Sequence, residues 1–323
     1  MRQSDTMIME SADSVLNRHM ELIIFPTEAC NFRCTYCYED HAKNNGMRPD
    51  VVKGIKNLMT ARAQDLTGLM MHWFGGEPLL RYDIIFDIMH HAQKLQAMNG
   101  FNLDSEATTN GYMLTPERLK GLVSAGVGSY QITLDGPKEI HDQSRIKTNG
   151  LGSFDKIWGN IIDARNTKLD FSIKIRIHVT EKNKDDVRLL LRNISEEIGN
   201  DSRFSVFPRL LSRLGSPNDK NLPISSDLED IPEYATSLGL KVLGKVEDYI
   251  CYASKPFTYA IRADGSVAKC TVMLRDDKNM LGKLNPDGTM ELDARKAIFW
   301  SRGFISGAKE ELECPAKVKN RSR

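Results

Sequence analysis

The sequence lacks three features that would assign it to a simple class: an excess of one charge, a long apolar run and an abundance of cysteine. Its 323 residues carry 44 basic and 43 acidic side chains, and this balance gives no electrostatic reason to expect nucleic acid or an anionic membrane as the main partner. No apolar stretch reaches the roughly 18 residues needed to cross a bilayer, and the N-terminus lacks the basic-then-apolar order of a signal peptide. We therefore expect a cytoplasmic protein.

Three of the six cysteines lie close together, in the segment CNFRCTYCYED. Randomly scattered cysteines would form such a triplet with an expected number of roughly 0.002, so the spacing of Cys30, Cys34 and Cys37 is not a coincidence. Disulfides are disfavoured in a reducing cytoplasm. The triplet therefore predicts metal ligands or catalytic thiols.

The middle of the chain alternates between strand-like and helix-like apolar patterns. The strand candidates are 20–27, 68–76, 101–111, 127–136, 171–179 and 204–211, and the helix candidates are 49–64, 82–96, 115–126, 153–166, 184–199 and 227–239. Thr115 and Ser153 are the predicted N-caps of two helices, and Gly126 is a predicted helix stop. Six βα units in series predict an α/β fold with a parallel sheet, as a partial (β/α)6 TIM-like barrel.

The pattern changes at about residue 250 to short strands. They are joined at Asp-Gly dipeptides that favour hairpins, at 264–265 and 287–288. We predict an N-terminal extension over 1–20, the barrel over 21–245, and a small C-terminal β domain over 246–323 that holds Cys251, Cys270 and Cys314. Residues 212–223 form a predicted polar surface loop.

The cysteine triplet follows the first predicted strand, at the end of a parallel sheet where active sites lie. Three thiolates can ligate iron or zinc, and both structural zinc and ferredoxin-type clusters use four ligands. One ligand position is therefore left open. His41 is a candidate fourth ligand for zinc, so a non-catalytic metal-binding module remains an alternative.

CNFRCTYCY resembles the CxxxCxxC signature of the radical S-adenosylmethionine superfamily, which has an aromatic residue, here Tyr36, before the last cysteine. Three further motifs occur in the order found in that family. WFGGEP at 73–78 is similar to its GGEP motif, and TNG at 109–111 to the motif after the third strand. LDGP at 134–137, followed by His141, Asp142 and Arg145, resembles a segment of peptide-modifying members that carry an auxiliary-cluster domain of the SPASM or twitch type.

The resemblance implies that Cys30, Cys34 and Cys37 bind three irons of a [4Fe-4S] cluster, and that S-adenosyl-L-methionine completes the shell of the fourth iron. It also implies a set of residues around that cofactor: Tyr36, Gly75, Gly76, Glu77, Pro78, Asn110, Thr133, Arg145, Arg176 and Val206. Within this set, Glu77 is expected to accept from the ammonium group, and Arg145 to pair with the carboxylate. Asn110 and Thr133 are candidates for the ribose or methionyl part and Val206 for the adenine.

Structural alternatives exist for most of these residues. The two glycines also suit an ordinary strand-end turn, Arg145 an exposed surface position, and the remaining residues ordinary strand positions. Arg176 and His178 alternate along the fifth predicted strand, so both are expected to point into the barrel.

The C-terminal cysteines resemble an auxiliary-cluster domain. Six cysteines allow at most one auxiliary cluster, because each cluster needs four ligands. Relatives have a CxxC motif at this point, but here Lys317 stands in place of its second cysteine. Cys251, Cys270 and Cys314 would therefore leave one iron open. Alternatively, the three cysteines are unligated core residues.

The expected activity, implied by the resemblance, is reductive cleavage of S-adenosylmethionine to a 5′-deoxyadenosyl radical that abstracts hydrogen from a substrate. Thr271 stands where sulfatase-maturing relatives have an Asp that acts as a catalytic base, and this difference puts formylglycine formation in doubt. We expect a side-chain cross-link, for example a cyclophane, thioether or ether, in a ribosomally made precursor peptide. A dehydrogenase or epimerase acting on a small molecule or peptide is the alternative.

The expected partners follow from the same resemblance. They are the precursor peptide, a flavodoxin or ferredoxin as electron donor, and a separate leader-binding protein, because only about 20 residues precede the first predicted strand. Neither nucleic acid nor a membrane is an expected partner.

Overall fold

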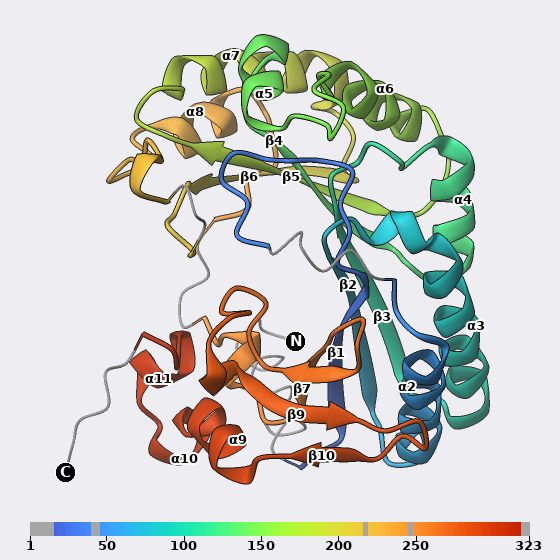
Figure 1. Cartoon of the computed structure of the whole chain (residues 1–323). Coiled ribbons are helices and arrows are strands. Elements are labelled where there is room, and N and C mark those ends of the chain that lie inside the picture. The colour runs from blue at the N-terminus through green and yellow to red at the C-terminus, as the bar shows by residue number, and fades with distance from the viewer. Residues whose placement is uncertain (1–15, 40–45, 216–218, 245–248, 318–323) are drawn as a thin grey trace, which may run out of the picture.

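The computed structural model describes residues 16–39, 46–215, 219–244 and 249–317. Ten strands form a single sheet in the order β10-β9-β8-β7-β1-β2-β3-β4-β5-β6 (Figure 1). The strands are β1 His19–Thr27, β2 Gly68–Gly75, β3 Asn102–Thr109, β4 Ser129–Leu134, β5 Ser172–Val179, β6 Phe204–Leu210, β7 Thr258–Ile261, β8 Ser266–Ala268, β9 Met280–Leu284 and β10 Met290–Leu292.

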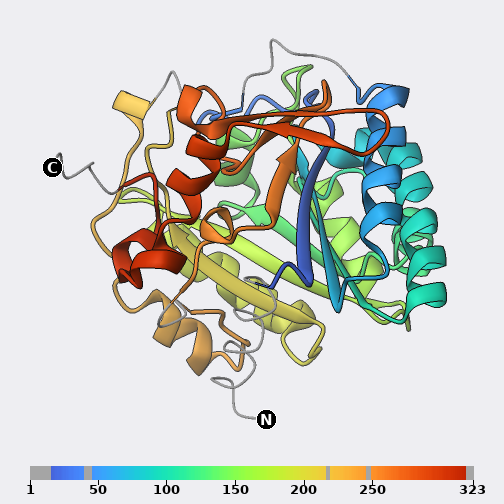
Figure 2. The same ribbon diagram turned by 90° about the horizontal axis from the view of Figure 1, so that it is seen from below.

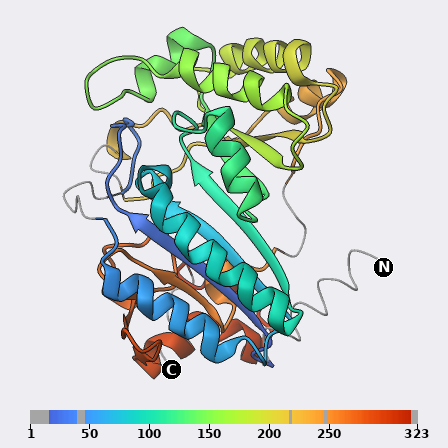
Figure 3. The ribbon, with the colours of Figure 1, turned by 90° about the vertical axis from the view of Figure 1, so that its right-hand side faces the viewer.

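Helices cover the outer face of the sheet, with α2, α3 and α4 side by side in Figure 3. The α-helices are α2 Pro49–Arg62, α3 Tyr82–Asn99, α4 Pro116–Ser124, α5 Lys138–Ser144, α6 Phe154–Arg165, α7 Lys184–Ile198, α8 Ile231–Ser237, α9 Ala294–Ser301, α10 Gly303–Ser306 and α11 Lys309–Glu313. Four 3₁₀ helices complete the described elements: η1 Pro78–Arg81, η2 Asp219–Asn221, η3 Tyr252–Ser254 and η4 Asp277–Asn279. Within the described ranges, none of the helices has the length and apolar character that crossing a bilayer requires.

β1 to β6 pair in parallel, each strand beside the next. The sheet curves without closing, so that β6 and β10 are its edges. The predicted partial (β/α)6 barrel is confirmed, and all six predicted strands and all six predicted helices are present. The sequence prediction missed α5, which lies inside the LDGP…HD..R segment.

The alternation along β5 shows why these strands are not uniformly apolar. Ile173, Ile175 and Ile177 are fully buried under the helices, whereas Lys174 and Arg176 between them are less buried. Parallel strands covered on both faces usually read as continuous apolar runs. The polar alternation therefore marks an inner face that lines a cavity.

The predicted helix ends lie at the expected residues, but one helix is capped by a different side chain than predicted. The side chain of Thr115 accepts from the backbone N of Arg118 at 3.4 Å, and Gly126 follows α4 with φ +91°. Ser153 precedes α6, but its side chain makes no cap bond. Oδ1 of Asp142 takes that place by accepting from the backbone N of Ser153 at 2.7 Å and of Phe154 at 2.9 Å.

The C-terminal strands extend the barrel sheet beyond β1 (Figure 2). β7 pairs with β1 in parallel, with Glu21 opposite Thr258, and β8, β9 and β10 follow in antiparallel order. Both predicted hairpins are present, with Gly265 at φ +84° and Gly288 at φ +91°. The domain boundaries at residues 20 and 246 stay a prediction, as does the loop at 212–223, part of which lies outside the described residues.

Candidate functional site

The cysteine triplet lies in the loop after β1, at the carboxyl ends of the parallel strands. Backbone bonds fix this loop from outside: Arg33 N donates to Ile146 O at 2.7 Å, and Thr35 N to Ser144 O at 2.9 Å. All three cysteines are free and half-buried. Their attachment to the loop that follows α5 brings the CNFRCTYCY and HD..R motifs together.

Burial raises the pKa of the Cys30 thiol to about 12 and that of Cys37 to about 11, and the neighbouring thiols act in the same direction. Thiols with such pKa values are protonated near neutral pH unless a bound cation favours the thiolate. In the described ranges, no three Cys, His, Asp or Glu side chains gather around one point as a single ion requires. The proposed zinc ligand His41 lies outside the described residues.

Gly75 and Gly76 pack against the chain that leads into the cysteine loop. Gly75 has φ +105°, and a Cβ on Gly76 would lie 2.3 Å from the carbonyl oxygen of Ala29. No other residue allows the end of β2 to approach this backbone so closely. The two glycines therefore have a structural role in placing Cys30, and their contact with a cofactor stays a prediction.

Glu77 joins three of the motifs. Its fully buried carboxylate accepts at Oε1 from Leu79 N at 3.0 Å and from Thr109 Oγ1 at 2.7 Å, and at Oε2 from Asn110 N at 2.7 Å. The amide of Asn110 then donates to Asn31 Oδ1, beside the first cysteine, at 2.8 Å. Pro78 begins η1 directly after Glu77. The predicted bond from Glu77 to an ammonium group stays a prediction.

Arg145 is buried at 7% exposure, so the alternative of an exposed surface arginine is wrong. Its Nη1 donates to the hydroxyl of Tyr36 at 2.8 Å, and its guanidinium lies over the ring of Phe32. Its Nε is buried and has no hydrogen-bond partner among the described residues. A buried donor without an acceptor is costly, and a carboxylate bound beside the cysteine loop would satisfy it.

Asp135 is the acceptor at the centre of the same buried network. Its Oδ2 accepts from Tyr36 and Ser144, each at 2.7 Å, and its Oδ1 lies 3.1 Å from Nδ1 of His178. Burial acts to raise the pKa of Asp135, but the bond and charge of His178, with Arg145, outweigh it and hold that pKa well below its usual range. The network is therefore anionic at its centre and fixes Tyr36, the residue before Cys37.

A cavity of about 560 Å³ lies inside the curved sheet, below the cysteine loop. Arg176 on β5 lines it, together with Tyr38 from the cysteine loop and Tyr252 and Thr271 from the C-terminal segment. The prediction that Arg176 points inward is confirmed, and His178 also lies on the inner face, bonded to Asp135. Thr133 is buried beside Arg176 in the β4–β5 register.

Val206 was predicted to line the adenine, but its side chain belongs to the hydrophobic core. Its neighbour Phe207 lines the cavity instead. Consecutive strand residues face opposite sides of a sheet, so the predicted residue is one position away from the inner face. A signal was available, because the polar residues of β5 and β6 mark the inner positions.

The C-terminal cysteines lie close to one another. Burial raises the pKa of Cys251 to about 11, and the charges of Cys270 and Cys314 add to the rise. The hydroxyl of Tyr249 is hydrogen-bonded to the thiol of Cys251, and Cys251 N donates to Leu312 O at 2.9 Å, which brings α11 to this site. Cys251 thus interacts electrostatically with both other cysteines, while their sharing of one site and their ligation of iron stay predictions.

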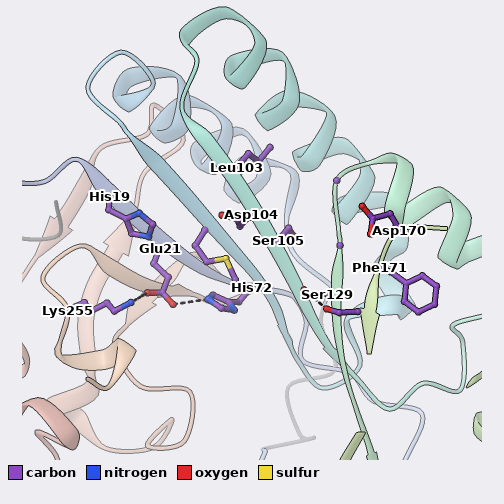
Figure 4. Close-up of a pocket in the computed structure, with 14 residues that line it drawn as sticks. His19, Glu21, His72, Leu103, Asp104, Ser105, Ser129, Asp170, Phe171 and Lys255 are labelled. Carbon is purple, nitrogen blue, oxygen red and sulfur yellow. Dashed lines mark hydrogen bonds and ion pairs between the residues drawn. The ribbon is translucent and has the colours of Figure 1, made fainter. Parts of the chain in front are cut away.

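A buried ionic group at the other end of the barrel was missed by the sequence analysis (Figure 4). Oε1 of Glu21 lies 2.7 Å from Nε2 of His72, and its Oε2 accepts from Lys255 at 3.3 Å and from Thr258 at 3.1 Å. Burial opposes ionisation, but these partners lower the pKa of Glu21 to about 2. A charged residue inside the otherwise apolar run MELIIF was the available signal. The group borders a second cavity of about 660 Å³.

The sequence matches the family described as the Radical SAM superfamily over residues 24–194. The chain belongs to this superfamily. Membership implies a [4Fe-4S] cluster and S-adenosylmethionine. The three free thiols with raised pKa values and the unpartnered Nε of Arg145 fit such a pair of groups.

Curated relatives include different chemistries. A cysteine-type anaerobic sulfatase-maturating enzyme from Clostridium novyi is 28% identical over 233 residues, which are 68% of this chain and 59% of the relative. An S-adenosylmethionine-dependent nucleotide dehydratase from Psychrobacter lutiphocae is 25% identical over 191 residues, 55% of this chain and 62% of the relative. The chain thus spans about 60% of the length of these two relatives.

Solved structures show the same fold. Native anSMEcpe with bound AdoMet and Kp18Cys peptide has a TM-score of 0.66 at 21% identity, covering 87% of this chain and 80% of that one. Streptococcus suis SuiB bound to the precursor peptide SuiA has a TM-score of 0.59 at 15% identity, covering 90% and 69%. The confirmed fold is the partial barrel of radical SAM enzymes.

Proposed function

We propose that this radical SAM protein modifies a ribosomally made peptide, most simply by installing a side-chain cross-link. The observation that carries the proposal is the cavity of about 560 Å³ that is lined both by Tyr38, next to Cys37, and by Thr271, next to Cys270. Tyr38, which lines it, interacts electrostatically with both Cys37 and Cys270. Structures of similar fold were solved with a Kp18Cys peptide and with the precursor peptide SuiA.

When bound, the cluster and S-adenosylmethionine supply a radical able to abstract hydrogen from an unactivated C–H bond. Cys30, Cys34 and Cys37 would hold the cluster, and the free Nε of Arg145 would bind the cofactor carboxylate. Of the other residues predicted around the cofactor, Gly75, Gly76, Glu77 and Asn110 lie at the carboxyl ends of β2 and β3, and Thr133 lies in β4. The walls of the cavity would orient the substrate and exclude water.

The residue at 271 supports a cross-link over formylglycine formation. Thr271 lines the cavity and its hydroxyl is 2.7 Å from that of Tyr252. A threonine hydroxyl cannot act as the carboxylate base that the resemblance places at this position in sulfatase-maturing enzymes. The proposed product is therefore a cyclophane, thioether or ether bridge.

We infer one auxiliary [4Fe-4S] cluster held by Cys251, Cys270 and Cys314, with one iron open. The proposed partners are the precursor peptide, a flavodoxin or ferredoxin, and a separate leader-binding protein, in the cytoplasm. The curated nucleotide dehydratase relative favours a second candidate, an enzyme acting on a small molecule.

The test uses anaerobically reconstituted enzyme with reductant, S-adenosylmethionine and the short peptide encoded beside its gene. The cross-link reading predicts a peptide mass lower by two hydrogens, with 5′-deoxyadenosine formed in proportion. A peptide mass that is unchanged in ordinary water but rises by one deuterium-for-hydrogen exchange in deuterated water would instead indicate epimerisation. Peptide-independent turnover of a nucleotide or another small molecule would contradict the peptide proposal.

A further inference from the structure

Two arginines on the inner wall formed by β5 and β6, Arg176 and Arg209, make no hydrogen bond or ion pair with the described residues. We propose that Arg176 and Arg209 bind a carboxylate of the substrate peptide, so that the enzyme selects peptides with an acidic residue near the modified position. This inference rests on the proposed function and names the substrate class of that same site.

The acidic side chains of the cavity are already paired. Glu21 is held by His72 and Lys255, and Glu106 lies 3.7 Å from the ammonium of Lys174. These groups leave no net negative charge on their side of the cavity. The unpaired charges among its described lining residues therefore belong to the two guanidinium groups.

Arg176 has an incomplete environment. It makes no hydrogen bond or ion pair with the described residues, and its Nε is buried without an acceptor. In the sheet register it lies between Thr133 and Phe207, neither of which is charged. A guanidinium held this way loses its hydration without compensation, whereas a carboxylate would pair with it in a two-point fork.

Arg209 lies on the same inner face, two residues after Phe207 on β6. Its guanidinium is 5.1 Å from the centre of the Phe207 ring and is exposed to the cavity. Burial lowers the pKa of Arg176, and the positive charge of Arg209 acts in the same direction, whereas Tyr38, Tyr36 and Asp135 act to raise it. The carboxylate of Asp135 also acts on Arg176, but it is already bonded to Tyr36, Ser144 and His178. The two guanidinium groups therefore form a site for a bridging carboxylate.

S-adenosylmethionine also carries a carboxylate, so the two sources must be separated. Arg145 is the better partner for the cofactor, since it lies against Tyr36 and interacts electrostatically with Cys34 in the cysteine loop. Arg176 lines its cavity with Tyr38 of the cysteine loop, but it makes no hydrogen bond to that loop among the described residues, and Tyr249 and Tyr252 of the C-terminal segment line the same cavity. The substrate is therefore the source we assign to Arg176.

The test is a selection of random peptides from a display library on the reconstituted holoenzyme loaded with S-adenosylmethionine. Wild-type protein, R176Q, R209Q and the control R295Q, at an exposed arginine of α9, are compared. We expect acidic residues to be enriched on wild-type protein and R295Q. The best peptide should bind R176Q at least about 30-fold more weakly, which is the cost of removing one partner of a buried charged pair.

Equilibrium dialysis of labelled S-adenosylmethionine separates the two carboxylates. R176Q should bind the cofactor like wild-type protein, and R145Q should bind it more weakly. Weak cofactor binding by R176Q, or selected peptides without acidic enrichment, would overturn the inference. A holoenzyme that selects no peptide, but binds a small carboxylic acid in an Arg176-dependent manner, would overturn the proposed function and keep the carboxylate site.

Discussion

The hydroxyl of Tyr36 donates a 2.7 Å hydrogen bond to Oδ2 of Asp135, which lies 99 residues later in the chain. The same hydroxyl accepts from Arg145 at 2.8 Å. One phenol thus connects the cysteine loop to both the LDGP and the HD..R segments. Because Asp135 and Arg145 are buried and Tyr36 is half-buried, their bonds are costly to leave unmade.

Replacing Tyr36 by Phe should therefore lower the free energy of unfolding by about 1–3 kcal/mol, because Asp135 and Arg145 each lose a partner. The measurement is denaturant unfolding of the variant and of wild-type protein. Tyr234→Phe is the matched control, since Tyr234 also accepts from an arginine, at 3.0 Å, but the pair is exposed. Its expected effect is within about 0.5 kcal/mol. Equal effects of the two substitutions would show that the buried network contributes nothing special.

Gly76→Ala should displace the cysteine loop. The added Cβ would lie 2.3 Å from Ala29 O and 2.7 Å from Glu28 O, so the backbone before Cys30 must move. We expect a stability loss of about 1–3 kcal/mol from overpacking, together with reduced iron content after reconstitution. Gly128→Ala is the control, because nothing lies within 4 Å of its Cβ position. Normal iron content in Gly76→Ala would show that the loop tolerates the shift.

The buried pair of Arg262 and Glu28 should fasten the C-terminal strands to the barrel. Nε and Nη2 of Arg262 donate to the two carboxylate oxygens of Glu28 at 2.8 and 2.7 Å. Glu28 lies two residues before Cys30. Arg262→Met leaves a buried carboxylate unpaired and should cost about 3–5 kcal/mol. The double variant with Glu28→Gln should be more stable than Arg262→Met alone. A double variant that is less stable than either single one would contradict this account.

His141 should make stability depend on pH. Burial, with the charge of Arg145, lowers its pKa from 6.5 to about 4. The unfolded state then binds more protons between these values, so stability is present above about pH 6.5 and is lost as pH falls towards 4. We expect a loss of about 2 kcal/mol between pH ~7.5 and ~5. His141→Gln should flatten this slope in denaturant unfolding; an unchanged slope would assign the dependence to other groups.

The sequence alone was sufficient for the barrel, because period-two strands and helical segments alternate six times and βα units admit few topologies. The residues of the family motifs were also found, because their spacing and order can be recognised in the sequence. The network between Tyr36, Asp135 and Arg145 could not be found, because it joins positions far apart in the chain. Likewise, the pairing of β7 with β1 depends on tertiary packing, and the hairpin signals at 264–265 and 287–288 say nothing of it.

Val206 shows a different kind of failure. The residue was placed on the correct strand, but the pleat turns its side chain into the core and presents Phe207 to the cavity. To assign each strand residue to the core or to the cavity, one must know which face of the sheet lines the cavity. Glu21 was missed because no role was assigned to a charged residue within an apolar strand.

The central claim is that Cys30, Cys34 and Cys37 hold an iron cluster with one corner kept for S-adenosylmethionine. The most direct test measures 5′-deoxyadenosine formed by anaerobically reconstituted, reduced protein with all three replaced by alanine. The account predicts no product above background and a loss of about four irons per chain. Variants of Cys251, Cys270 and Cys314 should retain that cluster. Release of 5′-deoxyadenosine by the first variant at the wild-type rate would contradict the account.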